Sequence, residues 1–256
     1  MMIAARALTV QKSGTNVLER VDCVIRPGQM TAICGPNGAG KSTLLTALAG
    51  LIAPAGGEVG LDGTPLAGLP PRQRARAIGF LPQQAETAWD VNVRTLVGLG
   101  RLPWRAVPGR PVRAGQEADD GAISSAVRDM QLDALIDRPI STLSGGEKAR
   151  AMMARVLAGE PRFILADEPF ASLDIGHARD LAHLLRCQAA YGRGLAIVMH
   201  DLALAMNHAD RVIVLDRGTL VADGRPEDAL DEAVIGKVWG TKVRWLGEAG
   251  ARALAI

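Results

Sequence analysis

The stretch Gly35-Pro36-Asn37-Gly38-Ala39-Gly40-Lys41-Ser42 decides the fold of this chain, because it fits the phosphate-loop pattern G-x-x-x-x-G-K-[ST] at every fixed position. Apolar residues 30–34 before it predict a buried strand, and residues 43–49 after it predict a helix. In that context the glycines let successive backbone N–H groups face one anion, and the start of the helix adds the positive end of its dipole. The sequence therefore predicts a nucleoside triphosphate site over these eight residues and Thr43, with Lys41 on the β- and γ-phosphates and the Ser42 hydroxyl on Mg²⁺.

The composition is that of a globular α/β protein. The chain has 256 residues, of which 48% are hydrophobic and 22% charged. Its apolar runs fall short of the roughly 18 residues of a membrane helix, and it has no N-terminal signal pattern, so we expect a cytoplasmic protein that meets a membrane only through a partner. The net charge of +2 gives no indication of nucleic-acid binding. The three cysteines have no C-x-x-C spacing and favour neither a disulfide framework nor a zinc site.

Residues 72–113 differ from the rest of the chain in charge. They contain eight arginines and no lysine, and their only acids are Glu86 and Asp90. Such a segment is either a solvated basic face or a surface for anionic lipid head groups or an acidic partner. The sequence leaves both interpretations open.

Three further patterns follow the phosphate loop along the chain. Leu143-Ser144-Gly145-Gly146-Glu147 opens a predicted helix that runs to residue 158. Residues 163–169 are an apolar strand ending in Asp167-Glu168-Pro169, which brings a carboxylate beside the phosphate loop. Ser172-Leu173-Asp174 comes next and, after another apolar strand, His200-Asp201. With all of these in this order, the chain resembles the ATP-binding cassette (ABC) family of ATPases over nearly its whole length.

The resemblance implies a site for ATP and Mg²⁺ and a role for each matching residue. Glu168 matches the general base that polarises the attacking water, and His200 the switch histidine that contacts the γ-phosphate. Gln83, in Leu81-Pro82-Gln83, matches the glutamine that senses Mg²⁺ and the water; we prefer it to Gln84 because it directly follows Leu-Pro. The implied Mg²⁺ ligands are Ser42, Gln83 and Asp167.

The remaining matches lie in the signature segment and in the loop after the acidic strand. Ser144, Gly145 and Gly146 are implied to close over ATP bound by the opposite subunit of a head-to-tail homodimer, and Asp174 belongs to the loop that joins the two sites. His177, His183 and His208 lie in polar, helical surroundings, so we expect them on the surface.

The implied fold is α/β: a P-loop NTPase of the ABC ATPase type, with an antiparallel β subdomain and an inserted helical subdomain. We expect residues 1–84 to form the first part of the nucleotide-binding core with the β subdomain, and 85–160 the helical signature subdomain. Residues 161–230 are expected to complete the core, and 231–256 to form a C-terminal helical tail. Strand-like apolar runs before residue 84 and after 161, with helical periodicity between them, agree with this division.

One departure from the family pattern concerns the base of the nucleotide. The family usually stacks adenine on an aromatic residue upstream of the phosphate loop, whereas residues 10–17 contain no aromatic side chain. Such a stack contributes about 1–3 kcal/mol in comparable base contacts. The sequence therefore predicts weak selectivity for adenine.

Residues 97–104, VGLGRLPW, resemble the Leu-Val-x-x-Gly-Arg-x-Pro pattern of ATPases that serve importers of ferric siderophores, haem and cobalamin. The segments 223–228 and 238–240 fit the same group. This implies a peripheral ATPase subunit on the cytoplasmic face of the inner or cell membrane, powering uptake through a separate, dimeric permease. A periplasmic or extracellular substrate-binding protein would act indirectly, and no nucleic acid is involved. The alternative is a soluble ABC ATPase in a non-transport assembly, which the single cassette and the lack of heptads disfavour.

Arg101 and Trp104 within that segment have two interpretations. Arginine and tryptophan dominate the energetics of protein interfaces, so the pair is predicted to dock the permease. Alternatively, a Gly-Arg-Leu-Pro stretch ends a helix and Trp104 packs under the following loop.

Overall fold

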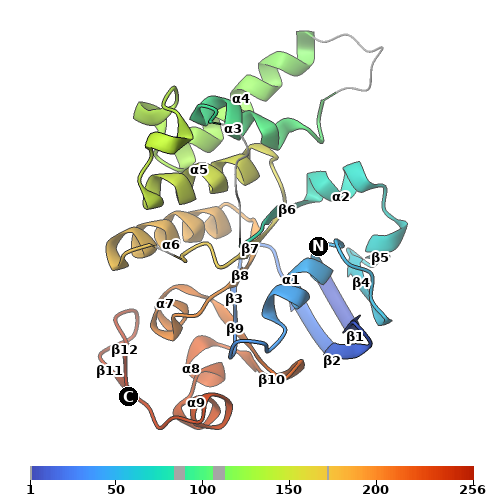
Figure 1. The fold of residues 1–256 in the computed structure, drawn as a ribbon, viewed down its shortest axis with the longest axis vertical. Helices are drawn as coiled ribbons and strands as arrows, with labels where there is room; N and C mark the ends of the chain where they lie inside the picture. The colour runs from blue at the N-terminus through green and yellow to red at the C-terminus, as the bar shows by residue number, and fades with distance from the viewer. Residues whose placement is uncertain (1, 84–89, 106–112, 172) are drawn as a thin grey trace.

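We describe a computed structural model of the chain over residues 2–83, 90–105, 113–171 and 173–256. A six-stranded sheet forms its centre (Figure 1), with strand order β10-β9-β3-β8-β7-β6. The strands are β3 (Met30–Cys34), β6 (Ile78–Leu81), β7 (Phe163–Asp167), β8 (Gly194–Val198), β9 (Arg211–Asp216) and β10 (Thr219–Gly224). All neighbours run parallel except the edge strand β10. The strand–loop–helix order predicted around the phosphate loop is confirmed, with β3 leading into α1 (Lys41–Leu48).

Every residue of β3, β7 and β8 is buried, because both faces of the sheet are covered. Alternate residues of β7 show the two faces: Ile164 packs with the helices α5 to α7, whereas Leu165 packs with α1 and the N-terminal strands. Figure 1 shows the same layers, with α6 (Ile175–Ala190) and α7 (Leu202–His208) on one side of the sheet and α1 on the other.

The second sheet is antiparallel, with order β2-β1-β4-β5, and corresponds to the predicted β subdomain. It comprises β1 (Ile3–Lys12), β2 (Thr15–Ile25), β4 (Gly56–Leu61) and β5 (Thr64–Pro65). Gly57 has φ 71°, and a Cβ at this position would lie 2.3 Å from the carbonyl oxygens of Arg6 and Ala7. A glycine is therefore required where β4 begins to pair with β1.

Helices gather above the sheet, as Figure 1 shows. They are α3 (Val93–Gly98), α4 (Arg113–Asp129) and α5 (Gly145–Ala158), joined by the 3₁₀ turns η2 (Leu99–Arg101), η3 (Asp133–Leu135) and η4 (Ile140–Thr142). All lie within the segment predicted to be helical. Their core is apolar and includes Leu96, Val127 and Met130. A shorter helix, α2 (Pro71–Ala77), precedes β6 and was not predicted; η1 (Leu66–Gly68) lies before it.

The predicted C-terminal helical tail is wrong in its second half. After α8 (Pro226–Ala229) and α9 (Glu232–Trp239), the chain forms two paired strands, β11 (Arg244–Leu246) and β12 (Ala253–Ala255). Gly240 ends α9 in the left-handed conformation, which stops the helix. Asn207 on α7 then holds the hairpin, because its side chain bonds both the N–H and the carbonyl oxygen of Arg252 at 2.8 Å.

None of the helices in the described part of the chain is long and apolar enough to cross a membrane.

Candidate nucleotide site and docking groove

The phosphate loop is shaped by close backbone packing. A Cβ on Gly35 would lie 2.2 Å from the carbonyl oxygen of Leu215, and one on Gly40 would lie 2.7 Å from the Leu18 side chain. Gly38, with φ 81°, has open space around it. The loop is thus packed on its protein side and open at Gly38, the form that lets backbone N–H groups approach a polyphosphate.

Lys41 is the first residue of α1 and bonds its own loop. Its Nζ donates to the carbonyl oxygens of Gly35 and Pro36 at 2.8 and 2.9 Å. Burial lowers the pKa of this ammonium, while the carboxylate of Glu168 opposes that shift. The charge is therefore partly desolvated and close to where a polyphosphate would lie, so its attraction for an anion is stronger than in water.

Ser42 and Asp167 meet although 125 residues separate them. The Ser42 hydroxyl donates to Asp167 Oδ1 at 3.0 Å, at the end of strand β7. Burial raises the pKa of Asp167, and the hydrogen bond from Ser42 opposes this. Hydroxyl and carboxylate oxygens are ligands that Mg²⁺ accepts. No cluster of three or more His, Cys, Asp or Glu side chains suited to a metal occurs among the described residues, so this pair fits a Mg²⁺ that takes its other ligands from phosphates and water.

Glu168 follows directly and lies between two polar side chains. Its Oε2 accepts a hydrogen bond from Gln83 Nε2 at 2.8 Å, and its Oε1 lies 2.6 Å from His200 Nε2. Glu168 has φ 52°, a left-handed conformation that is uncommon for residues other than glycine and is often found at functional sites. The structure therefore brings together Gln83, Glu168 and His200, next to the Ser42–Asp167 pair. Gln84 lies outside the described residues.

The signature residues form a second cluster. Ser144 caps α5 in a capping box with Glu147: Glu147 N–H bonds Ser144 Oγ, and Ser144 N–H bonds the Glu147 carboxylate. A Cβ on Gly146 would lie 2.5 Å from the ring of His177, and His177 Nδ1 lies 2.8 Å from Asp174 Oδ2. Hydrogen bonds from His177 lower the pKa of Asp174.

The Glu168 cluster and the signature cluster border the same cavity. Within the described part of the chain, no hydrogen bond joins one cluster to the other. This cavity of about 350 Å³ is lined by Gln83 and Glu168 on one side and by Gly145 and Lys148 of α5 on the other. His177 was expected only as a surface residue; it is half exposed, but it also connects the signature glycine to Asp174. Its spacing of three from the N-cap Asp174 is the sequence signal that could have indicated this.

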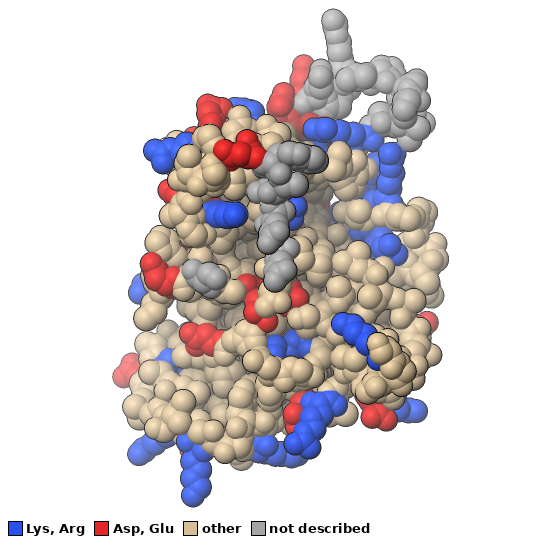
Figure 2. Space-filling model, in the orientation of Figure 1, with Lys and Arg blue, Asp and Glu red and all other residues tan. Residues whose placement is uncertain are grey.

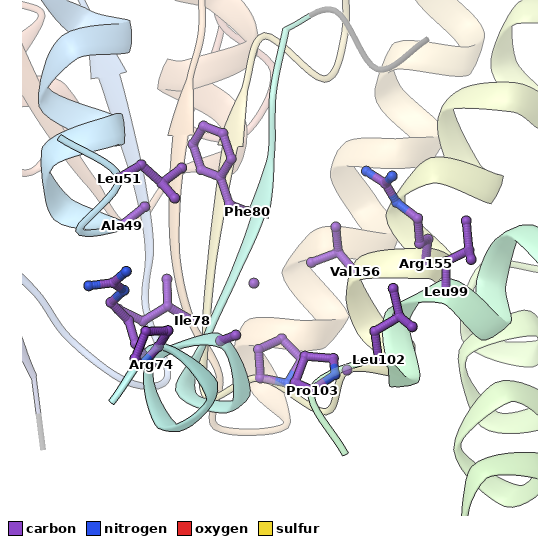
Figure 3. Close-up of a pocket in the computed structure, with 16 residues that line it drawn as sticks. Ala49, Leu51, Arg74, Ile78, Phe80, Leu99, Leu102, Pro103, Arg155 and Val156 are labelled. Atoms are coloured by element: carbon purple, nitrogen blue, oxygen red, sulfur yellow. The ribbon is translucent and has the colours of Figure 1, made fainter. Parts of the chain in front are cut away.

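A larger groove of about 460 Å³ lies between the core and the helical subdomain (Figure 3). Its walls are mostly apolar, and Leu51, Leu99 and Leu102 expose about half of their surface there. Figure 3 shows Leu51, Ile78 and Phe80 on the core side, facing Leu99, Leu102 and Val156. Large apolar side chains exposed together in a groove mark an interaction site.

The predicted docking role of Arg101 is wrong, because this side chain is buried. Arg101 is 3% exposed; its guanidinium pairs with Asp119 at 2.7 Å and Glu160 at 2.6 Å and bonds the carbonyl oxygen of Ala158 at 2.8 Å. Trp104 Nε1 bonds the Gly159 carbonyl at 2.8 Å. Both residues therefore fasten η2 to the end of α5. Most of the loop under which Trp104 is expected to pack lies outside the described residues.

The neighbouring Gly100 explains the rest of the Gly-Arg-Leu-Pro segment. A Cβ on Gly100 would lie 2.0 Å from the carbonyl oxygen of Arg155, so a glycine is required for η2 to lie against α5. This contact sets Leu102 and Pro103 in the wall of the groove. The Gly-Arg-Leu-Pro segment therefore forms part of one wall of the groove, and Leu99, Leu102 and Pro103 line that wall.

The arginine-rich segment is divided among different roles. Figure 2 shows Lys and Arg side chains over α2, the helix that carries Arg72, Arg74 and Arg76. Arg72 is solvent exposed, whereas Arg76 lies over the Trp104 ring, 4.5 Å from its centre. Arg74 lines the groove. One arginine-rich stretch thus supplies a buried ion pair, a ring contact and a groove wall, and not one uniform basic face.

Comparison with known proteins identifies the family of the chain. The pattern of the ABC transporter family matches residues 18–171, which include the phosphate loop, the signature and Glu168. The chain belongs to the ABC transporter family. Members that serve importers are ATPases whose hydrolysis is coupled to transport, and ATP is their nucleotide.

Relatives within the family cover most of the chain. The hemin import ATP-binding protein HmuV of Nocardia farcinica is 41% identical over 93% of this chain and 82% of its own. HmuV of Rhodopseudomonas palustris is 40% identical, covering 93% and 87%. Among solved structures, cbiO1 of Clostridium perfringens, part of the ABC transporter complex cbiONQ, is 26% identical with a TM-score of 0.80, covering 92% of each chain. The ADP conformation of MJ1267, an ATP-binding cassette of an ABC transporter, is 24% identical, covers 93% and 97%, and confirms the fold with a TM-score of 0.81.

Proposed function

We propose that this chain is the ATP-hydrolysing subunit of an importer of haem, and that two copies act on one permease at the cytoplasmic face of the membrane. The observation that carries the ATPase is the placement of Glu168 between Gln83 and His200, next to the Ser42–Asp167 pair. The haem assignment rests on the relatives named for hemin import. Other iron chelates and cobalamin remain the competing cargoes.

In the proposed reaction, ATP binds with its phosphates on the loop and at the start of α1. Lys41 leaves its two carbonyl partners for the β- and γ-phosphates, since an anion is a stronger partner than a neutral carbonyl. Ser42, Asp167 and Gln83 would hold Mg²⁺, which supplies charge stabilisation at the phosphates. Glu168 then polarises the attacking water as general base, and His200 moves from the Glu168 carboxylate to the γ-phosphate.

The separation of the two clusters supports a site shared between subunits. Ser144, Gly145, Gly146 and Asp174 have no hydrogen bond to the phosphate-loop cluster in the described part of one chain. We therefore propose a head-to-tail homodimer in which the signature helix of each copy closes over ATP on the other. The exposed side chain of Ile175, next to Asp174, is available for such a contact.

The groove between Leu51 and Leu102 is proposed to receive a cytoplasmic helix of the permease. It replaces Arg101 as the expected docking site, since its exposed leucines match the apolar face of a helix. A substrate-binding protein outside the membrane would contact the permease and not this chain.

The test is uptake by proteoliposomes that contain this ATPase and the permease encoded with it, loaded with MgATP. The binding protein is supplied with haem, a ferric hydroxamate siderophore or cobalamin in parallel. We expect haem uptake that depends on ATP, with the other two cargoes transported more slowly. Uptake of another cargo in preference to haem would contradict the assignment of haem as the cargo. An active ATPase that supports no uptake at all would favour a non-transport assembly.

A further inference from the structure

Two positive side chains face the apolar groove from its opposite walls. Arg74 lies on the α2 wall beside Ile78, and Arg155 lies on the α5 wall beside Leu99 and Val156, as Figure 3 shows. The Arg74 side chain packs over Gly50, where a Cβ would lie 2.9 Å from Arg74 Cδ. Both arginines are partly buried.

Neither guanidinium has a carboxylate partner among the described residues. The groove lining contains no Asp or Glu, and no hydrogen bond or ion pair joins Arg74 or Arg155 to another described side chain. Burial lowers the pKa of Arg155, and no described acidic group offsets this. The nearby Arg101 shows the usual arrangement, since it is buried against both Asp119 and Glu160. Desolvated charges without a partner destabilise a protein. Two arginines in a groove with no carboxylate partner among the described residues therefore indicate that the partner arrives with the occupant.

We propose that the permease helix seated in this groove carries an acidic side chain that pairs with Arg155 and lies within reach of Arg74. This proposal rests on the proposed function, because it assigns the chemistry of the same docking site. Arginine binds carboxylates through a planar fork with two parallel hydrogen bonds, which fixes the orientation of the helix as well as its charge. The exposed leucines supply apolar contact, and the acidic residue selects the matching permease.

The apolar walls favour a protein helix over an anionic lipid. A hydrated phosphate head group would satisfy the arginines but would leave Leu51, Leu99 and Leu102 exposed to water. An amphipathic helix with one acidic residue satisfies both requirements. The arginines on α2 outside the groove, such as Arg72, remain free to contact solvent.

The experiment measures binding of this ATPase to the permease encoded with it, held in phosphatidylcholine nanodiscs, for the wild type and for Arg155→Gln, Arg155→Lys and Arg74→Gln. Arg72→Gln is the matched control, because it removes an exposed charge from the same helix as Arg74. We expect Arg155→Gln to weaken binding by at least about tenfold and Arg155→Lys to weaken it less, since a charge pair buried in an interface loses a partner. Arg72→Gln should bind like the wild type.

Thermal unfolding of the isolated variants separates this from a structural role. Arg155→Gln removes a half-buried charge that has no ion-pair partner in the described part of the chain, so its melting temperature should be unchanged or higher, and its basal ATPase should match the wild type. A melting temperature several degrees lower would show that Arg155 has a partner within the chain and would overturn the proposal. So would wild-type affinity of Arg155→Gln for the permease.

A charge exchange tests the acidic partner itself. Each Asp and Glu in the cytoplasmic helices of the permease is replaced by Arg and combined with Arg155→Glu. Recovery of binding by one combination is the expected result, and recovery by none would overturn the carboxylate assignment. Binding to empty nanodiscs with anionic phosphatidylglycerol, lost in Arg155→Gln, would instead assign the groove to lipid. A wild type that fails to bind the permease would contradict the proposed function and not merely this pairing.

Discussion

His200 Nε2 lies 2.6 Å from the Oε1 atom of Glu168, whose other carboxylate oxygen accepts a hydrogen bond from Gln83. Both oxygens of the proposed base are thus occupied by side chains from two different strand ends. Departure of either partner would leave more of the carboxylate's roughly four acceptor sites open to the attacking water. Nucleotide binding, by attracting His200 and Gln83, would free the carboxylate at the moment when its substrate is in place.

Replacing Glu168 by Gln should abolish turnover and leave ATP binding intact. The amide keeps the shape of the side chain but cannot act as a base, a role that contributes about 10²–10⁴ in rate. Phosphate release measures turnover, and light scattering with MgATP should show an accumulated closed dimer. Glu58→Gln, an exposed change in the β subdomain, serves as the control. Wild-type activity in Glu168→Gln would contradict the assignment of Glu168 as the general base.

Asp167→Asn should stabilise the nucleotide-free protein at neutral pH. Because burial raises the pKa of Asp167 above its unfolded value, its contribution to stability is fully present below the unfolded pKa and is lost as the pH rises through the folded pKa. The uncharged amide can still accept from Ser42. At neutral pH we expect the melting temperature of the nucleotide-free variant to exceed that of the wild type by about 2–4 °C for each kcal/mol recovered. At about pH 4 this difference should be smaller. Adding MgATP should not raise the melting temperature of the variant further. A lower melting temperature at neutral pH would contradict this.

Gly146→Ala should displace the His177 ring, since the added Cβ would lie 2.5 Å from it. The His177–Asp174 contact would then be lost, which lowers the unfolding free energy. His177→Ala removes the clash, so a double-mutant cycle by urea unfolding should show strong coupling between the two positions. ATPase activity should stay low in the double mutant, because the signature glycine is proposed to approach ATP of the opposite subunit. Restored activity would assign the glycine to packing alone.

Arg101→Gln should destabilise the helical subdomain by about 1–3 kcal/mol, because it leaves the partly buried carboxylate of Asp119 without its main charged partner. Asp119 and Glu160 both pair with this guanidinium. Arg105→Gln is a matched control: Arg105 is exposed and lies 4.0 Å from the same Asp119. Urea unfolding decides the outcome. Equal stability of the two variants would mean that the Arg101 ion pairs contribute little.

GTP should be hydrolysed with a kcat/KM within about tenfold of that for ATP, since one lost aromatic stack of about 1.4 kcal/mol corresponds to that ratio. The turn between β1 and β2 contains Ser13 and Gly14 in place of an aromatic residue and is exposed. Side-by-side steady-state kinetics measure the ratio. A preference for ATP above about a hundredfold would show that another group reads the base.

Local patterns predicted much of the nucleotide-binding core. The phosphate loop and the strand ending in Asp167 are defined by residues adjacent in sequence, and the capping pattern at Ser144 marked the start of α5. The predicted α/β fold is confirmed by the solved relatives. The predicted helix after Ser144 is long and periodic in sequence, so its predicted end at residue 158 agrees with the observed end of α5 at Ala158.

What could not be predicted depends on contacts distant in sequence. Arg101 is indistinguishable from an interface arginine until Asp119 and Glu160 are placed around it. The tail departs from a helix because Asn207, on a different helix, holds the hairpin that follows Gly240. Hydrophobic periodicity indicates the type of each helix or strand separately, and it does not predict hydrogen bonds or ion pairs between different elements.

The groove has its walls on two different parts of the molecule, with Leu51 and Phe80 in the core and Leu102 and Val156 in the helical subdomain. Any rotation of one part against the other must therefore change its width. Because binding linkage is reciprocal, a compound that fits only one width would resist that rotation. A small molecule lodged there could inhibit the ATPase without competing with ATP, and its action would persist at saturating nucleotide.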